Sequence, residues 1–137
     1  MSEEKTRAIL TRYWESKHAD LDVLADNATA TLMASGETAR GPEAVQDLLD
    51  NLYYVAFEAD PRPRNTLYAD GHAVWEGHLV GRHTGEFAGL PATGKDVCVP
   101  LCVVYDLADG HIERTRIYLE MDVLRRQLGL EEKSLDD

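Results

Sequence analysis

Residues 81–100 read GRHTGEFAGLPATGKDVCVP, and this stretch decides how the second half of the chain folds. It joins two runs of alternating apolar and polar residues, 72–82 and 95–107, and it carries four glycines and little charge. Such alternation is typical of strands that bury one face. Most hairpin loops are short and polar. A long connection with apolar Phe87 and Leu90 therefore raises the question of what these side chains cover.

Two further runs beside this pair, 64–69 and 111–119, are also predicted strands. Ala69-Asp70-Gly71 and Ala108-Asp109-Gly110 predict tight turns, since aspartate and glycine tolerate the dihedral angles that such turns need. Pro100 predicts a bend or bulge in its strand, because proline cannot donate to the hydrogen-bond ladder. The second half is therefore expected to be an antiparallel sheet.

The first half shows helical periodicity. A helix is predicted over 3–18, a short helix over 21–25 and a strand over 29–34, closed by the turn SGET. Gly41-Pro42-Glu43 predicts another helix start. The buried stripe of that helix is expected at Val45, Leu48, Leu49, Leu52 and Val55. The prolines of DPRPR at 60–64 end it in a solvated loop.

A last helix is predicted over 121–128, stopped by Gly129. Helices that precede a sheet indicate an α+β fold, with helices covering one face of a curved antiparallel sheet. The 137 residues suit one domain, expected over 1–130, and the polar residues 131–137 form a C-terminal tail.

Charge and hydropathy exclude several classes of partner. The formal net charge is −11, which disfavours nucleic acid and anionic membranes as partners. No apolar run approaches the roughly 20 residues of a membrane span. The N-terminal residues lack the basic and then apolar layout of a secretion signal, so we expect a cytoplasmic protein. Cys98 and Cys102, about 13 Å apart on one strand, are expected to be free thiols.

Three segments together resemble a known family: GRHTGEFAGLPATGK at 81–95, VYDLADGHI at 104–112 and RRQLGL at 125–130. They are similar to the SnoaL-like polyketide cyclases, of ester cyclase type, in the nuclear-transport-factor-2-like superfamily. The resemblance implies a cone-shaped α+β barrel with an internal apolar cavity, usually a homodimer. It also implies an intramolecular aldol cyclisation that uses neither metal nor organic cofactor.

The family's proton-transfer residues are missing at the matching positions. The resemblance implies an aspartate on the last strand and a histidine on the strand before it. Counted from the 109–112 turn, those positions hold Ile117 and Val103. The fold is expected to survive this change, whereas that particular proton chemistry is not.

Three other residues are therefore candidates for catalysis. His83 near the cavity rim titrates near neutral pH and could move a proton, or its ring could anchor the glycine-rich loop. Glu120 could be a buried base, or it could pair with Arg116 or Arg82, or favour the dipole of the following helix. Tyr105 is a polar group on an otherwise apolar inner face, together with Glu113 and Thr115.

A wider set of residues is predicted to line the cavity. Trp75, with glycines on the same strand face, suggests room for a flat ligand, although a tryptophan packed over glycine is the simpler interpretation. Phe87 and Leu90 either close over a ligand or only cover the open end of the barrel. The expected substrate-binding residues are Tyr13, Trp14, Met33, Trp75, Phe87, Leu90, Val103, Ile117 and Leu119.

Two classes of function follow. One is a cofactor-free cyclase or isomerase that moves protons on an apolar, polyketide-like or cyclic carbonyl compound, with hydration or epoxide opening as a related reaction. The other is a non-catalytic small-molecule-binding or accessory dimeric protein, which the aliphatic Val103 and Ile117 favour. No metal is expected, because the histidines and acids show no ligand spacing.

Overall fold

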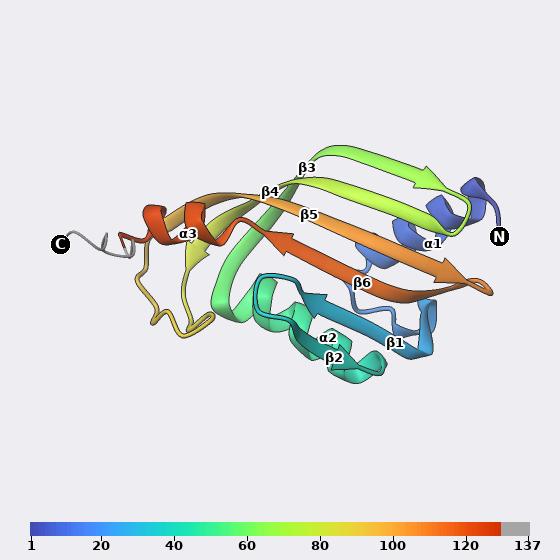
Figure 1. The fold of residues 1–137 in the computed structure, drawn as a ribbon, viewed down its shortest axis with the longest axis horizontal. Coiled ribbons are helices and arrows are strands. Elements are labelled where there is room, and N and C mark those ends of the chain that lie inside the picture. The colour runs from blue at the N-terminus through green and yellow to red at the C-terminus, as the bar shows by residue number, and fades with distance from the viewer. Residues whose placement is uncertain (130–137) are drawn as a thin grey trace.

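The structure is a computed structural model and describes residues 1–129, so the predicted tail 131–137 lies outside the described residues. Within these described residues, three α-helices, two short irregular helices and six strands follow one another (Figure 1). In order they are α1 (Glu3–Glu15), η1 (Leu21–Val23), β1 (Leu24–Leu32), β2 (Glu37–Arg40), α2 (Pro42–Asp50), η2 (Asn51–Ala56), β3 (Phe57–Ala69), β4 (His72–His83), β5 (Asp96–Ala108), β6 (His111–Leu119) and α3 (Met121–Gln127).

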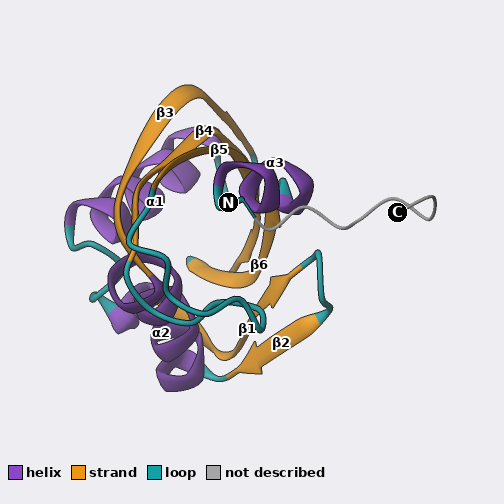
Figure 2. Cartoon of the chain, turned by 90° about the vertical axis from the view of Figure 1, so that its left-hand side faces the viewer, coloured by secondary structure: helices purple, strands orange, loops and turns teal. Residues whose placement is uncertain are grey.

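All six strands form one sheet in the order β2-β1-β6-β5-β4-β3. Seen end-on, the sheet curls around an interior that α1 and α2 flank (Figure 2). The fold is α+β, as predicted, but the sheet is unclosed and mixed, because β1 pairs with β6 in parallel. The expectation of a purely antiparallel sheet was wrong in this respect. A parallel pair needs a long crossover connection, and here most of the chain lies between the two strands.

The first half departs most from the predicted boundaries. Helix α1 ends at Glu15 instead of 18, because Lys17 and His18 adopt left-handed backbone angles with φ of 56° and 65°. The short helix predicted over 21–25 is only the 3₁₀ turn of η1, and β1 begins at Leu24, well before 29. Asp26 and Asn27 have low strand propensity, so the sequence pattern did not indicate a strand at this point.

Strand β2, which was not expected, begins within the predicted turn SGET. Only two residues of β2, Ala39 and Arg40, continue past that turn, so the segment is too short to show a period. Helix α2 passes into the π-helix η2, which shifts the buried face of this segment. Val55, expected in the buried stripe, is therefore 58% exposed.

The prolines of DPRPR lie inside β3 and not in the predicted loop. β3 is an edge strand, and a proline is tolerated where its missing N–H would face solvent. Its pairing with β4 shifts register between Pro63 and Asn65, which leaves Arg64 as the extra residue of a bulge. Edge position and bulge together let β3 run unbroken to Ala69.

The central strands match the predictions within one residue at each end. On β5 the predicted inner positions are all buried: Val97, Val99, Leu101, Val103 and Tyr105. On β6, Thr115, Ile117 and Leu119 are buried as predicted. Glu113 is only half-buried, and Ile112 takes the inner position in its place. The cause is a register shift opposite Asp106 and Leu107.

Pro100 causes no bulge in its pairing with β4, where the register is continuous. The Pro100 carbonyl oxygen accepts a hydrogen bond from the Glu120 backbone N–H at 3.2 Å, so this carbonyl group points toward the end of β6. An N–H at this position would point to the same strand, so the missing donor of Pro100 costs one bond at the end of the β5–β6 ladder.

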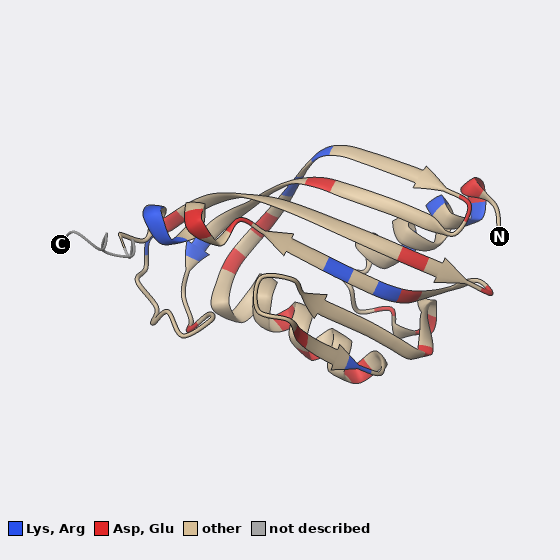
Figure 3. Cartoon of the chain, viewed as in Figure 1, with Lys and Arg blue, Asp and Glu red and all other residues tan. Residues whose placement is uncertain are grey.

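Charged residues are spread over helices and strands (Figure 3). The tightest group centres on Asp106, whose carboxylate accepts hydrogen bonds from Arg116 at 2.6 and 3.2 Å. Arg114 and His72 approach the same carboxylate at 3.2 and 3.0 Å. The hydrogen bond from Arg116 is the main reason that the pKa of Asp106 is lowered. This cluster ties β4, β5 and β6 together on the outer face. Within residues 1–129, no helix has the length and apolar character that crossing a membrane requires.

Candidate functional site

A pocket of about 410 Å³ opens between the end of α1, the π-helix η2 and the concave faces of β3, β4 and β5. We call it the aromatic pocket, because six aromatic side chains line it. Its lining includes Trp14, His18, Tyr53, Trp75, Val103 and Tyr105. The first half of the chain thus supplies one wall and the sheet the other.

Trp14 and Tyr105 meet across this pocket. The Trp14 indole Nε1–H donates a hydrogen bond of 3.1 Å to the Tyr105 hydroxyl oxygen. Indole can only donate, so the Tyr105 oxygen is the acceptor and its own hydrogen stays free for another partner. Burial raises the pKa of Tyr105 to about 12, so the hydroxyl is neutral near pH 7. The arrangement offers a preset hydrogen-bond donor.

His18 is one of the pocket residues that the sequence predictions missed, and Tyr53, on which it stacks, is another. The His18 ring stacks on Tyr53 with centroids 5.2 Å apart and planes 7° apart, and it meets Tyr13 edge-on at 4.9 Å. Burial lowers the pKa of His18 to about 4. A signal was present: His18 follows Trp14 by four residues, and a helix continued to 18 would place both on one face.

Gly77, on the same strand face as Trp75, does not open room for a ligand. A Cβ atom built on Gly77 would lie 2.0 Å from the Arg62 carbonyl oxygen and 2.9 Å from Cη2 of Trp75. Gly77 therefore lets the β3 backbone and the indole approach closely, which is the simpler of the two interpretations. Room for a ligand comes instead from the gap between the sheet and the end of α1.

A second pocket of about 660 Å³, which we call the lid-end pocket, lies beneath the loop that follows β4. Its lining includes Phe87, Ile117 and Leu119. Phe87 packs edge-on against Phe57 with centroids 5.3 Å apart, so the loop inserts its phenyl ring into the end of the core. The residues predicted to line one chamber are thus divided between two pockets.

His83 is fully buried at the end of β4 and far from Tyr105. Tyr105 pairs with Ala73, and the ten residues from Ala73 to His83 span about 33 Å of strand. The His83 Nδ1 atom lies 3.2 Å from the Thr93 hydroxyl, and the ring stacks on Phe57 at 5.2 Å. Burial lowers its pKa. These contacts match the loop-anchor interpretation of His83.

Glu120 is exposed, so the expectation of a buried carboxylate there was wrong. It occupies the N-cap position of α3. Neither arginine considered as its partner contacts it in the structure, because Arg116 pairs with Asp106 and Arg82 with Asp96. The polypeptide leaves β6 at this point, which turns the side chain away from the interior.

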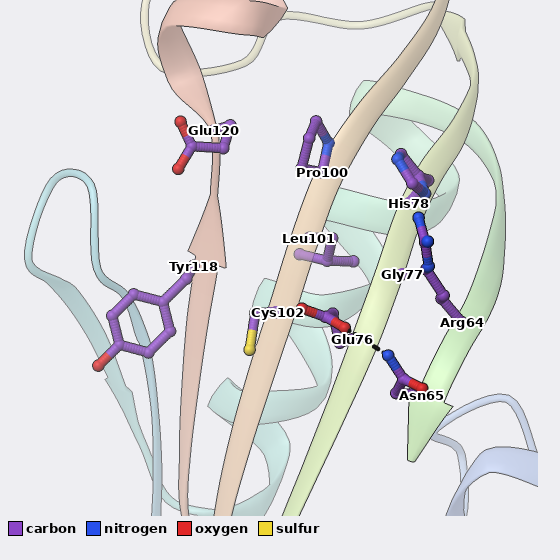
Figure 4. A pocket seen from close by; sticks show the side chains of 10 residues that line it. All are labelled: Arg64, Asn65, Glu76, Gly77, His78, Pro100, Leu101, Cys102, Tyr118 and Glu120. Carbon is purple, nitrogen blue, oxygen red and sulfur yellow. Dashed lines mark hydrogen bonds between the residues drawn. The ribbon is translucent and has the colours of Figure 1, made fainter.

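Glu120 instead borders a hollow of about 570 Å³ on the outer face of the sheet. Figure 4 shows its neighbours there, among them Glu76, His78 and Tyr118. Cys102 also lies in this hollow, and both cysteines are free thiols, as predicted. This hollow lies on the face of the sheet opposite to the aromatic pocket.

The remaining predicted lining residues differ in their positions. Tyr13 is fully buried behind His18, whereas Met33 is 39% exposed beyond the end of β1. Leu90 is half-buried and bridges to Phe87 within the loop. Among the described residues, no group of three or more His, Cys, Asp or Glu side chains is placed to hold a metal ion.

Comparisons with known proteins place this geometry in context. A family model described as SnoaL-like polyketide cyclase matches residues 6–128. A candidate SnoaL-like polyketide cyclase from Jannaschia sp. superposes with a TM-score of 0.80 at 19% identity, covering 95% of each chain. A candidate polyketide cyclase from Xanthomonas campestris gives 0.78 at 20% identity, covering 92% of this chain and 98% of the other.

A protein from Catenulispora acidiphila with a ketosteroid isomerase-like fold, solved with trimethylamine, gives a TM-score of 0.71 at 16% identity. That match covers 89% of this chain and 92% of the other. At these identities the structural matches show the shared fold alone. No curated protein sequence matches the chain.

Proposed function

The chain belongs to the SnoaL-like polyketide cyclase family, and from this premise we propose that it is a cofactor-free cyclase or isomerase of an apolar carbonyl compound. Family membership supports a cyclase- or isomerase-type function in general. The finer proposal is that the aromatic pocket binds a polyketide-like or cyclic ketone and that the reaction proceeds by proton transfer next to its carbonyl group.

The Trp14–Tyr105 hydrogen bond carries this proposal. Removing a proton next to a carbonyl places negative charge on the carbonyl oxygen. A fixed donor aimed at that oxygen stabilises the developing charge more than it stabilises the ketone. Tyr105 can serve as this donor, because Trp14 occupies the oxygen and leaves the hydroxyl hydrogen available.

The shape of the pocket supports a flat, apolar substrate. Its volume of about 410 Å³ lies in the range of small-molecule sites. Trp75 and Val103 offer apolar surface from the sheet, and Trp14 faces them from α1. Burial of such a ligand would supply binding free energy at roughly 25 cal/mol per Å² of apolar surface.

The experiment measures enolisation directly. The probe is 2-tetralone in D₂O, and proton NMR follows the loss of its α-hydrogen signal with and without the protein. Both tryptophans of the chain, Trp14 and Trp75, line the aromatic pocket, so quenching of intrinsic fluorescence reports binding there. The proposal expects saturable binding and catalysed exchange. Binding with no exchange above buffer would contradict catalysis.

That second outcome would instead support a non-catalytic small-molecule-binding function, which one observation favours. Val103 and Ile117, at the family's proton-transfer positions, are aliphatic and nearly fully buried. The pocket would then bind an apolar molecule by burial alone.

The homodimer implied by the family resemblance stays a prediction, as does the cytoplasmic location. Sedimentation velocity of the full chain at several concentrations tests the former. A monomer mass of 15.3 kDa throughout would contradict it.

A further inference from the structure

We propose that His18 is the general base of this reaction, a role that rests on the proposed function of the aromatic pocket. The imidazole takes the α-proton of the bound ketone. The electron pair of the broken C–H bond forms the carbon–carbon double bond of the enolate, whose oxygen carries the charge while Tyr105 donates a hydrogen bond to it. The imidazolium then returns a proton to the product carbon, so the step is balanced without a further reactant.

The first support is an unpartnered ring nitrogen in a residue that lines the pocket. Among residues 1–129, four buried side-chain polar atoms lack a hydrogen-bond partner: Tyr13 Oη, His18 Nδ1, His83 Nε2 and Thr115 Oγ1. Of these four residues, His18 is the one that lines the aromatic pocket. A buried polar atom without a partner costs roughly 1–3 kcal/mol, so each one calls for an explanation. His83 differs in that its other ring nitrogen, Nδ1, lies 3.2 Å from the Thr93 hydroxyl.

The second support is the backbone that holds His18. Lys17 and His18 are consecutive non-glycine residues with positive φ, of 56° and 65°. Their N–H groups donate to the Trp14 and Tyr13 carbonyl oxygens at 2.9 and 3.0 Å, so the chain folds back over the end of α1. The left-handed conformation costs roughly 1–2 kcal/mol per residue, and such strain concentrates at functional sites. Here the left-handed conformation accompanies the stacking of the imidazole on Tyr53.

The third support is the neutrality of the ring's nearest surroundings. The rings in contact with it are Tyr13 and Tyr53. Burial raises the pKa of both tyrosines far above neutrality, so neither offers a charge. An imidazole between neutral rings keeps its lone pair at pH 7, as a base requires.

Among residues 1–129, the charged groups that approach this region lie at its edges. Lys17 precedes His18, and Asp60 of β3 lines the outer part of the pocket, where its side chain is 75% exposed. The charge of Asp50, at the end of α2, contributes to the raised pKa of Tyr13 and of Tyr54. Tyr105 is the further titratable group that faces the pocket from the sheet.

The test compares wild type, His18→Gln and the matched control His111→Gln in the 2-tetralone assay. His111 is exposed at the start of β6, and its ring Nδ1 lies 2.9 Å from the Asp109 carbonyl oxygen. We expect His18→Gln to lower the exchange rate by about 10²-fold or more, the usual contribution of a general base, and to keep fluorescence-detected binding within a factor of about three. The control keeps wild-type exchange.

The outcomes separate this inference from the proposed function. If His18→Gln exchanges 2-tetralone at the wild-type rate, the base role is overturned and the proposed function stays intact. Wild type that binds but does not exchange overturns both.

A second measurement applies to wild type and does not depend on the folding of a variant. NMR titration of the imidazole gives the pKa of His18, and the exchange rate must rise with pH through that same value. A rate inflection more than about one unit away from it overturns the inference.

Discussion

The Trp14 indole donates its only hydrogen bond to the Tyr105 hydroxyl, joining the end of α1 to the inner face of β5 across 91 positions of sequence. The ring centroids lie 5.9 Å apart and the ring planes are inclined by 64°, the edge-on geometry that aromatic pairs favour. This contact fixes the hydroxyl group on which the proposed chemistry depends, and it ties helix to sheet.

Replacing Tyr105 with Phe removes both the acceptor of Trp14 and the donor to a substrate. We expect the free energy of unfolding to fall by about 1 kcal/mol, the net value of one hydrogen bond, and 2-tetralone exchange to fall about 10²-fold. Denaturant titration and NMR measure the two effects. Tyr118→Phe is the control, because Tyr118 is 44% exposed and faces the outer surface. Equal exchange in both variants would contradict the role of Tyr105.

Gly77→Ala is expected to destabilise the protein by about 3 kcal/mol, because the new methyl group would collide with β3 backbone that cannot easily move. Gly36→Ala is the control, since a Cβ there meets nothing within 4 Å and only its φ of 79° is unfavourable. That strain alone should cost about 1 kcal/mol. Thermal unfolding compares the two variants, and similar losses would contradict the steric explanation.

Asp106→Asn is expected to lower stability at pH 7 by about 2 kcal/mol, because the half-buried Arg116 loses its charged partner. The lowered pKa of Asp106 means that its stabilisation is present above the unfolded value and is lost as pH falls through the folded value. The difference between wild type and variant should therefore shrink toward low pH. Asp96→Asn is the control: its pair with Arg82 is exposed on both sides and should contribute little.

The lowered pKa of His18 also predicts that the stability of the protein depends on pH. The folded pKa of His18, about 4, lies below the ordinary 6.5, so the unfolded chain binds the proton first. Stability therefore falls as pH falls from about 6.5 to about 4, by about 3 kcal/mol at most for the full shift. His18→Gln should lack this part of the acid sensitivity in urea titrations across the window. Parallel curves for wild type and variant would refute the lowered pKa.

Phe87→Ala tests the loop over the lid-end pocket. The ring is 6% exposed and packs on Phe57, so its loss should cost about 3 kcal/mol of stability. Binding of 2-tetralone, reported by Trp14 and Trp75, should stay near wild type, because Phe87 lines the other pocket. Loss of binding in a folded variant would show that the two pockets act as one. Leu67→Ala, at a position that is 64% exposed, serves as the stability control.

Local pattern in the sequence determined the central strands and their inner face. The predicted runs 72–82, 95–107 and 111–119 match β4, β5 and β6 within one residue, because alternation is a local property of an extended chain. The buried positions of β5 follow from the same alternation. The family resemblance, carried by the segments 81–95, 104–112 and 125–130, likewise predicted the α+β fold.

Tertiary structure alone decided how these parts combine into a site. The parallel pairing of β1 with β6 and the extension of β3 through two prolines both depend on residues far apart in sequence. The same holds for His18, whose place against Tyr53 requires a left-handed turn and a π-helix to meet. Periodicity records which face of a segment is buried. It carries no information on which distant segment covers that face, and that contact sets the chemistry of the pocket.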